Sequence, residues 1–352
     1  MMERLPWMHN RDLIANSVPS MRYDGEECFG KWQVEARAKL RELLCLDAIK
    51  KPDDLDFKLE YTYDESEYTE YRFTLESEEG YVFPSVMRVP RNKAGKLPLA
   101  ICLQGHSNGF HISLGKPIFD EDVEDIKHGD RDFAVRAVKE GYVAVAVEQR
   151  NFGECGGKPD NGHPDCHVSS MNAIINGRTT IGERVHDVSC VIDAVLENFD
   201  FIDRDRIMCV GNSGGGTTTF YAAAIDERIS LAVPSCAVCT YKDSIAAMKH
   251  CVCNFIPNIA KYFDMGDIGG LIAPRKLVIV NGIEDKIFPD EGVRESFHII
   301  SGLYRDANAE GKCVLVTGEG GHRFYADPAW RAIHKLSDND WMFYDLEQEE
   351  LD

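Results

Sequence analysis

A serine flanked by glycines is the residue of this chain best suited to nucleophilic chemistry. The segment 211–215, Gly-Asn-Ser-Gly-Gly, fits the pattern G-x-S-x-G. An apolar run ends at Gly211 and a helical pattern follows Ser213, the strand–turn–helix order that exposes a nucleophilic hydroxyl above a sheet. The N–H of Gly214 would then lie at a helix N-terminus, where it can stabilise a developing oxyanion. Such a turn can also bind a phosphate, but Thr217 stands where a P-loop would carry its lysine.

A carboxylate and a histidine follow Ser213 in the order that this kind of site requires. Asp285 and His322 each lie just after a short apolar run, and glycines surround His322. In a Ser–Asp–His order, the histidine takes the serine proton and the carboxylate fixes the imidazole tautomer. We therefore predict a catalytic triad of Ser213, Asp285 and His322, with Glu284 as the alternative carboxylate.

A second oxyanion donor is expected from the loop after the first parallel strand. That strand is predicted at 97–103 and is followed by Gln104-Gly105-His106. The backbone N–H of His106 is the best candidate, because a main-chain donor does not depend on the side chain. The alternative is that His106 is a loop residue without a part in catalysis.

The apolar periodicity predicts the elements that must position these residues. Three alternating runs without intervening helices indicate an antiparallel meander, at 57–63, 68–75 and 81–89. Six further strand-sized runs alternate with helical stretches, which indicates a parallel, doubly wound sheet. They lie at 97–103, 142–147, 206–210, 229–233, 276–280 and 313–316. The intervening or following helices are predicted near 131–140, 181–199, 214–225, 290–305 and 327–336.

The domain organisation follows from the same pattern. Residues 1–56, with a helix at 31–46, are expected to be an N-terminal helical extension. Residues 57–352 are expected to form one catalytic domain. Two long irregular excursions, 154–180 and 237–272, are expected to emerge at the carboxyl ends of the strands and to form the acyl and alcohol pockets.

The composition restricts which binding partners and which cellular compartment we expect. The chain has 352 residues and a formal net charge of −20, which opposes binding to nucleic acid or to an anionic membrane surface. We expect the acidic stretch 120–132 and the tail 347–352 to be solvated surface. The N-terminal residues lack an apolar signal core, and with twelve cysteines this favours a cytoplasmic, reducing location. The sequence does not define the oligomeric state, and both a monomer and a homo-oligomer are compatible with it.

Cysteines and histidines gather in the two excursions. They are Cys236, Cys239, His250, Cys251 and Cys253 in or near one, and His163, Cys166 and His167 in the other. Zinc and a disulfide are two interpretations of this group. However, Cys-x-Cys is an awkward tetrahedral pair and a second Cys-x-x-Cys is missing. We therefore expect the cysteines to pack as small buried hydrophobes, with no metal and no cofactor.

Several segments resemble a known family. Gln104-Gly105-His106 is similar to the His-Gly-x oxyanion turn of the α/β-hydrolase superfamily, although Gln104 replaces the usual histidine. Segment 148–153 is similar to its Asp-x-Arg-Gly-x-Gly segment, with Glu148 and Asn151 in place of Asp and Gly. Longer stretches resemble the bacterial acetyl xylan esterase-like, dienelactone-hydrolase-related branch. They are 210–216, 235–240, 250–254, 272–275 and 320–325.

The resemblance implies a metal-independent serine carboxylesterase acting on small acyl esters, with acetylated carbohydrate as the leading substrate class. Its partner would be a small-molecule or oligosaccharide ester. Ser213 argues against a true dienelactone hydrolase, which uses a cysteine nucleophile. Lactone or amide hydrolysis by the same triad and a catalytically silent binding protein are the alternatives. We expect Arg150 to bond locally rather than to contact substrate.

Overall fold

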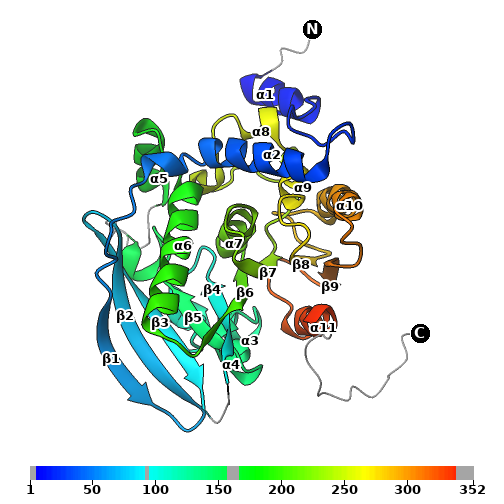
Figure 1. Ribbon diagram of the computed structural model, residues 1–352. Coiled ribbons are helices and arrows are strands. Elements are labelled where there is room, and N and C mark those ends of the chain that lie inside the picture. The colour runs from blue at the N-terminus through cyan, green and yellow to red at the C-terminus, as the bar shows by residue number, and fades with distance from the viewer. Residues whose placement is uncertain (1–4, 92–94, 157–165, 338–352) are drawn as a thin grey trace.

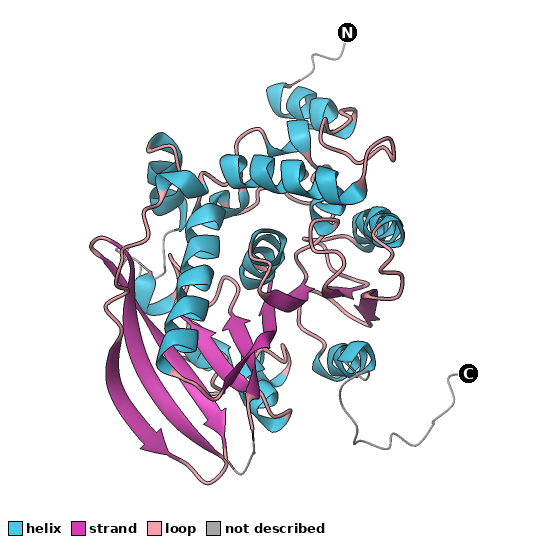
Figure 2. Cartoon of the chain, in the orientation of Figure 1, coloured by secondary structure: helices cyan, strands magenta, loops and turns pink. Residues whose placement is uncertain are grey.

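A mixed nine-stranded sheet forms the centre of the molecule. The computed structural model describes residues 5–91, 95–156 and 166–337. The strands lie in the order β1-β2-β3-β5-β4-β6-β7-β8-β9, and helices cover both faces of the sheet (Figures 1 and 2).

The N-terminal part of the sheet is antiparallel, as the alternating pattern predicted. It contains β1 (Lys58–Asp64), β2 (Tyr68–Glu78) and β3 (Tyr81–Pro90). These strands pair consecutively, and β3 also pairs antiparallel with β5. On β2, Phe73 and Leu75 are buried while Thr74 between them is partly exposed. Every residue of β1 is exposed, and its register shifts between Leu59 and Tyr61.

The remaining strands are parallel to one another, which confirms the predicted mostly parallel sheet. They are β4 (Leu97–Leu103), β5 (Val143–Val147), β6 (Ile202–Asn212), β7 (Ile229–Ser235), β8 (Lys276–Gly282) and β9 (Cys313–Gly318). Because these strands run in one direction, their carboxyl ends share one edge of the sheet. That edge carries Ser213 after β6, Asp285 after β8 and His322 after β9.

Strand residues alternate between two hydrophobic cores, one on each face of the sheet. On β4, Leu99, Ile101 and Leu103 belong to the larger core, whereas Ala100 and Cys102 belong to the smaller one. The larger core is closed by α2 (Phe29–Leu43), α6 (Thr180–Asn198), α7 (Gly214–Ile225), α9 (Met265–Gly269) and α10 (Asp290–Asp306). The smaller core is closed by α4 (Phe133–Lys139) and α11 (Ala326–Ser337).

The N-terminal extension packs directly on this framework. On α2, Trp32, Ala36 and Leu40 are buried in the larger core, as their helical spacing predicted. Arg37 donates a hydrogen bond of 3.0 Å to the carbonyl of Ala224, near the end of α7. The extension therefore shares its core with the sheet and its helices, while the boundary at residue 56 stays a prediction.

Among the described residues, five helices lie outside the predicted stretches or within segments expected to be irregular. They are α1 (Pro6–Ala15), α3 (Asp120–Lys127), α5 (Cys166–Ile175), α8 (Ile259–Tyr262) and α9. Over the described residues, no helix has both the length and the apolar character needed to span a bilayer.

The charged residues of the acidic stretch 120–132 are exposed or partly exposed, as expected, with one exception. Asp122, in the acidic stretch 120–132, is fully buried rather than solvated. Its carboxylate accepts hydrogen bonds from the N–H groups of Ile118 and Phe119 at 2.9 and 2.8 Å, and its Oδ1 accepts from Asn108 at 2.8 Å. These bonds compensate the cost of burying the charge. The tail 347–352 lies outside the described residues.

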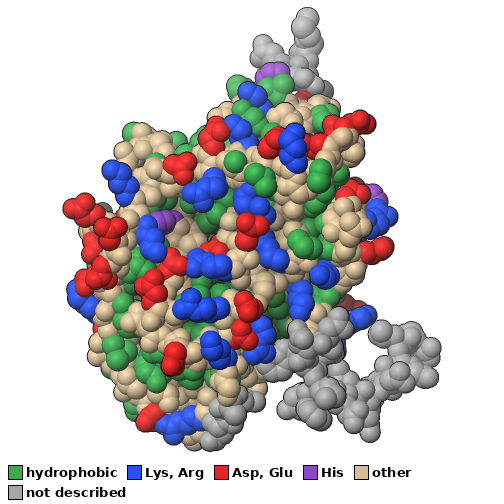
Figure 3. Space-filling model, viewed as in Figure 1, with side chains coloured by type: hydrophobic (Ala, Val, Ile, Leu, Met, Phe, Trp, Pro, Cys, Tyr) green, Lys and Arg blue, Asp and Glu red, His purple; other side chains and the backbone are tan. Residues whose placement is uncertain are grey.

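Acidic and basic side chains are interspersed on the face drawn in Figure 3. On that face the net charge of −20 is not gathered into one acidic patch. Many of the carboxylates pair with arginine or lysine, as Glu60 and Glu154 do with Arg72 at 2.6 and 2.7 Å.

Candidate active site

Ser213 occupies a strained turn between β6 and α7. Its backbone has φ 54° and ψ −120°, a conformation that residues with a side chain rarely adopt. The N–H of Ser213 donates to the carbonyl of Ser235 at 2.8 Å, and the carbonyl of Ser213 accepts from Thr217 at 2.8 Å. The turn is thus fixed from β7 on one side and by the first turn of α7 on the other, as a nucleophile elbow requires.

The glycines around Ser213 are required by close backbone approach. A Cβ on Gly211 would lie 2.6 Å from the carbonyl carbon of Gly215, and one on Gly216 would lie 2.5 Å from the carbonyl oxygen of Ser235. A Cβ on Gly215 would overlap the carbonyl of Leu103 on β4. The glycines at positions 211, 215 and 216 therefore permit α7 to start close to the ends of β4, β6 and β7.

Asp285 and His322 are in contact. Nδ1 of His322 lies 2.8 Å from Oδ2 of Asp285, whose side chain is completely buried. Burial opposes ionisation, but hydrogen bonds from His322 and from the N–H groups of Ile287 and Phe288 outweigh it and lower the pKa of Asp285. Because an ionised carboxylate only accepts, Nδ1 carries the proton and Nε2 is left as the basic nitrogen. The alternative carboxylate, Glu284, is exposed.

Ser235, which sequence reasoning missed, connects the serine turn to the histidine loop. Its Oγ is 2.9 Å from Oδ1 of Asn212 and 3.4 Å from the carbonyl of Arg323. Ser235 thereby connects Asn212, which precedes Ser213, to Arg323, which follows His322. Among the described residues, no hydrogen bond joins Ser213 Oγ to His322 directly. In free enzymes this bond is often long and tightens only with substrate.

The loop after β4 lies against the serine. A Cβ on Gly105 would be 2.7 Å from the carbonyl of Asn212 and 2.9 Å from Cβ of Ser213. The ring of His106 is near enough to α7 that a Cβ on Gly214 would lie 3.2 Å from it. Within the described part of the chain, the N–H groups of His106 and Gly214 donate to no other residue. Both predicted oxyanion donors are therefore beside Ser213 and without a protein acceptor.

A buried glutamate supports this loop. Oε2 of Glu148 accepts hydrogen bonds from the N–H groups of Phe110 at 3.5 Å and Glu154 at 3.0 Å. It lies so close to Gly109 and Gly153 that a Cβ on either would collide with it. Burial raises the pKa of Glu148 to about 8.

Arg150 bonds locally, as expected. Its guanidinium contacts Asp187 at 2.7 and 2.9 Å and Glu78 at 2.6 Å. It also lies 3.9 Å from the ring centre of Tyr81. This buried network joins β2, β3 and α6.

The structure separates the cysteines that the sequence grouped together. Cys236 is near the predicted triad, with its thiol 3.3 Å from the carbonyl of Arg323, and burial raises its pKa to about 12. Cys239 is buried against the carbonyl of Pro289. His167 is exposed on α5, and His163 lies outside the described residues.

Cys251 and Cys253 instead meet residues from two other segments. Each of His106, Cys166, Cys251 and Cys253 offers a ligand atom, and these four atoms all lie within 4.8 Å of one another. Sequence spacing could not show this convergence, because the four residues come from three separate parts of the chain.

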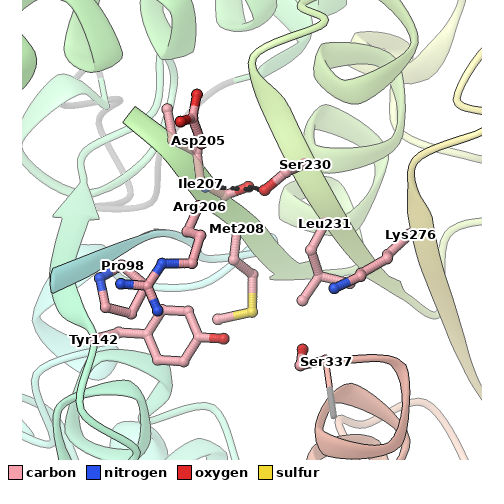
Figure 4. Close-up of a pocket in the computed structure, with 10 residues that line it drawn as sticks. All are labelled: Pro98, Tyr142, Asp205, Arg206, Ile207, Met208, Ser230, Leu231, Lys276 and Ser337. Atoms are coloured by element: carbon pink, nitrogen blue, oxygen red, sulfur yellow. Dashed lines mark hydrogen bonds between the residues drawn. The ribbon is translucent and has the colours of Figure 1, made fainter. Parts of the chain in front are cut away.

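One pocket lies at the edge of the sheet opposite to the predicted catalytic residues. Figure 4 shows it at the amino-terminal ends of the parallel strands, whereas Ser213 follows the carboxyl end of β6. The lining residues are Pro98, Tyr142, Asp205, Arg206, Ile207, Met208, Ser230, Leu231, Lys276 and Ser337.

The sheet order and the elbow define an α/β-hydrolase fold. The model of the Abhydrolase family matches residues 19–305, and the chain belongs to this family. Among curated proteins, it is 26% identical over 242 residues to "Putative hydrolase YtaP" of Bacillus subtilis (strain 168), covering 68% of this chain and 77% of that one.

Solved structures with low identity share the fold. A "putative acetyl xylan esterase" of Bacteroides fragilis NCTC 9343 superposes with a TM-score of 0.76 at 19% identity, covering 90% of this chain and 83% of that one. A glucuronoyl esterase of Solibacter usitatus superposes with a TM-score of 0.67 at 14% identity, covering 93% of this chain and 98% of that one.

Proposed function

We propose that this protein is a serine carboxylesterase that hydrolyses small acyl esters, acetyl esters of carbohydrates first among them. The observation that carries the proposal is the 2.8 Å contact between His322 Nδ1 and the buried Asp285, at the edge of the sheet where Ser213 is held at φ 54°. His322 Nε2 takes the proton of Ser213 as Oγ attacks the ester carbonyl. The N–H groups of Gly214 and His106 bind the oxyanion.

The second half of the reaction uses the same groups. His322 returns the proton to the leaving alcohol, which departs and leaves an acyl-enzyme on Ser213. It then takes a proton from water as the water attacks that acyl group, and the second oxyanion collapses to release the acid. The residues present therefore account for acid, base, nucleophile and oxyanion stabilisation with no cofactor in these steps.

The proposed substrate class is supported by the structural neighbours, whose sequence identity to this chain is low. One neighbour is described as a "putative acetyl xylan esterase" and another as a glucuronoyl esterase, and we extend the carbohydrate-ester class that both names give to this chain. We propose a small-molecule or oligosaccharide ester as the partner and the cytoplasm as the compartment. The two excursions 154–180 and 237–272 are proposed to form the acyl and alcohol pockets.

A substrate panel with a matched variant tests the function. Acetylated xylo-oligosaccharides, p-nitrophenyl acetate, p-nitrophenyl butyrate and a methyl ester of glucuronic acid would be compared. We expect acetyl esters to be hydrolysed fastest, and Ser213→Ala to lower kcat by at least about 10³-fold. Ser189→Ala, which removes a hydroxyl that donates to Asp226 rather than to a residue of the proposed site, should leave kcat unchanged.

A covalent probe separates this proposal from a catalytically silent protein. A fluorophosphonate should label wild type at Ser213 and leave Ser213→Ala unlabelled. Absence of labelling in a folded wild type would refute the serine mechanism. Labelling together with turnover of only lactones or amides would refute the acetyl-ester assignment and retain the triad.

A further inference from the structure

We propose that His106, Cys166, Cys251 and Cys253 bind a structural Zn²⁺ ion. Their four candidate ligand atoms lie within 4.8 Å of one another, with His106 Nε2 3.2 Å and Cys251 Sγ 3.3 Å from Cys253 Sγ. In a tetrahedral zinc site with Zn–S bonds of about 2.3 Å, ligand atoms are about 3.8 Å apart. The cluster therefore has the dimensions of such a site.

The donor set selects the metal. Three thiolates and one imidazole form a closed tetrahedral Cys₃His set, which is typical of structural zinc and leaves no position for a water nucleophile. Hard cations such as Mg²⁺ and Ca²⁺ require oxygen ligands instead. The ion would thus hold the fold together rather than attack the ester.

An independent observation, Arg184, points to negative charge in the cluster. Arg184 is one of the largest fully buried side chains. Its Nη1 lies 3.7 Å from Cys253 Sγ and its Nη2 lies 3.8 Å from Cys166 Sγ. Within the described residues, no carboxylate forms an ion pair with it. A buried guanidinium without a counter-charge is costly.

Zinc binding resolves this imbalance. Binding of Zn²⁺ displaces the protons of three thiols, and three thiolates with a neutral imidazole leave a net charge of −1 on the site. The guanidinium of Arg184 then neutralises the complex. Arg184 also donates to the carbonyl of Arg150 at 3.1 and 2.8 Å, but that acceptor is neutral. Three neutral thiols would therefore leave the guanidinium without a counter-charge, and one disulfide would consume only two of the three cysteines.

The location gives the ion a role in organising the site. Cys166 begins α5 in one excursion, and Cys251 and Cys253 belong to the other. His106 belongs to the loop that lies against Ser213. One ion would therefore tie both excursions to that loop. For His106 this role rests on the proposed function, in which its N–H is an oxyanion donor, whereas the metal site itself does not depend on that function.

Elemental analysis of the full-length protein, purified without chelators, tests the site directly. We expect about one zinc per chain, and Co²⁺ exchanged for zinc should give the visible bands of a tetrahedral ion with a thiolate charge-transfer band. Cys253→Ser and Cys251→Ser should each lower bound zinc at least about tenfold. Cys28→Ser, at an exposed thiol, and Cys190→Ser, at a buried thiol outside the cluster, should retain it.

Three results would overturn the proposal. They are a wild type that binds no zinc even after incubation with Zn²⁺, zinc that remains bound in both cluster variants, and a disulfide among the three cysteines in the purified protein. If the variants do not fold, titration of wild type with a mercurial decides. Release of one zinc with the modification of about three thiols supports the site, and release without thiol modification refutes it. Ester turnover is measured separately, so failure of the metal site and failure of the esterase proposal are distinguishable.

Discussion

His322 Nδ1 lies 2.8 Å from Asp285 Oδ2, although the two residues follow different strands of the sheet. The carboxylate is shielded from solvent, whereas the histidine side chain remains 20% exposed. The pair therefore has one end anchored in the protein and one end available to a substrate.

Asp285→Asn should lower kcat roughly 10⁴-fold, the loss seen when the triad aspartate of a serine protease is replaced by asparagine. An amide at this position can donate to Nδ1, which favours the tautomer that carries its proton on Nε2 and so removes the base. Steady-state hydrolysis of p-nitrophenyl acetate measures the effect. Glu284→Gln, one residue away and exposed, is the control. An equal loss in both variants would contradict the assignment of Asp285.

Gly105→Ala should reduce kcat/KM by about 10²-fold or more, because its Cβ would lie 2.9 Å from Cβ of Ser213 and would displace the loop that carries the proposed oxyanion donor His106. The matched control is Gly30→Ala on α2, where an added Cβ meets no atom within 4 Å. Kinetics and thermal melting should be recorded together. Unaltered kinetics in Gly105→Ala would show that this close approach is not needed for activity.

Arg150→Ala should destabilise the fold by about 3–5 kcal/mol, because it leaves the buried carboxylate of Asp187 without its partner. Since Arg150 contacts protein groups, KM of the folded fraction should not change. Urea unfolding measures the loss. Arg294→Ala removes an exposed ion pair within α10 and should cost less than about 1 kcal/mol. A raised KM in Arg150→Ala, with stability retained, would indicate substrate contact instead.

Glu148→Gln should remove part of the pH dependence of stability. The pKa of Glu148 is about 8 in the folded protein and about 4.3 in an unfolded chain. Between these values the folded state holds a proton that the unfolded state has lost. The free energy of unfolding therefore falls as pH rises, by at most about 1.4 kcal/mol per pH unit.

Urea unfolding at about pH 6 and about pH 7.5 measures this slope. The fall between the two pH values should be smaller in Glu148→Gln than in wild type. It should be unchanged in Glu197→Gln, an exposed site on α6. Parallel pH profiles for wild type and Glu148→Gln would mean that Glu148 is ionised in the fold.

Much of this architecture could be predicted because local hydrophobic patterns indicate where the strands and helices lie. Alternation along β2 and the strand-sized apolar runs from β4 to β9 reflect which side chains are buried, and burial is a local requirement. The order of Ser213, Asp285 and His322 was informative for the same reason, since each follows a strand and parallel strands end at one edge.

Features that depend on long-range contact could not be predicted. Cys236 and Cys239 have the spacing of a metal motif, yet the fold places Cys236 against the carbonyl of Arg323, near the predicted triad, and Cys239 against the carbonyl of Pro289. Cys166 and Cys253 meet only because two excursions fold toward each other. The burial of Asp122 could not be predicted, because the composition of an acidic run does not indicate which of its carboxylates accepts backbone hydrogen bonds.

The exposed strand β1 has a consequence for how the molecule behaves in crowded solution. As the outermost strand of the sheet, it presents unpaired backbone groups to which a strand of another molecule could add. Two of its features hinder such addition. Lys58, Glu60 and Asp64 place charges along the strand, and the shift between Leu59 and Tyr61 breaks its regular spacing. We therefore expect the charges and the register shift together to hinder the addition of a further strand at this edge of the sheet.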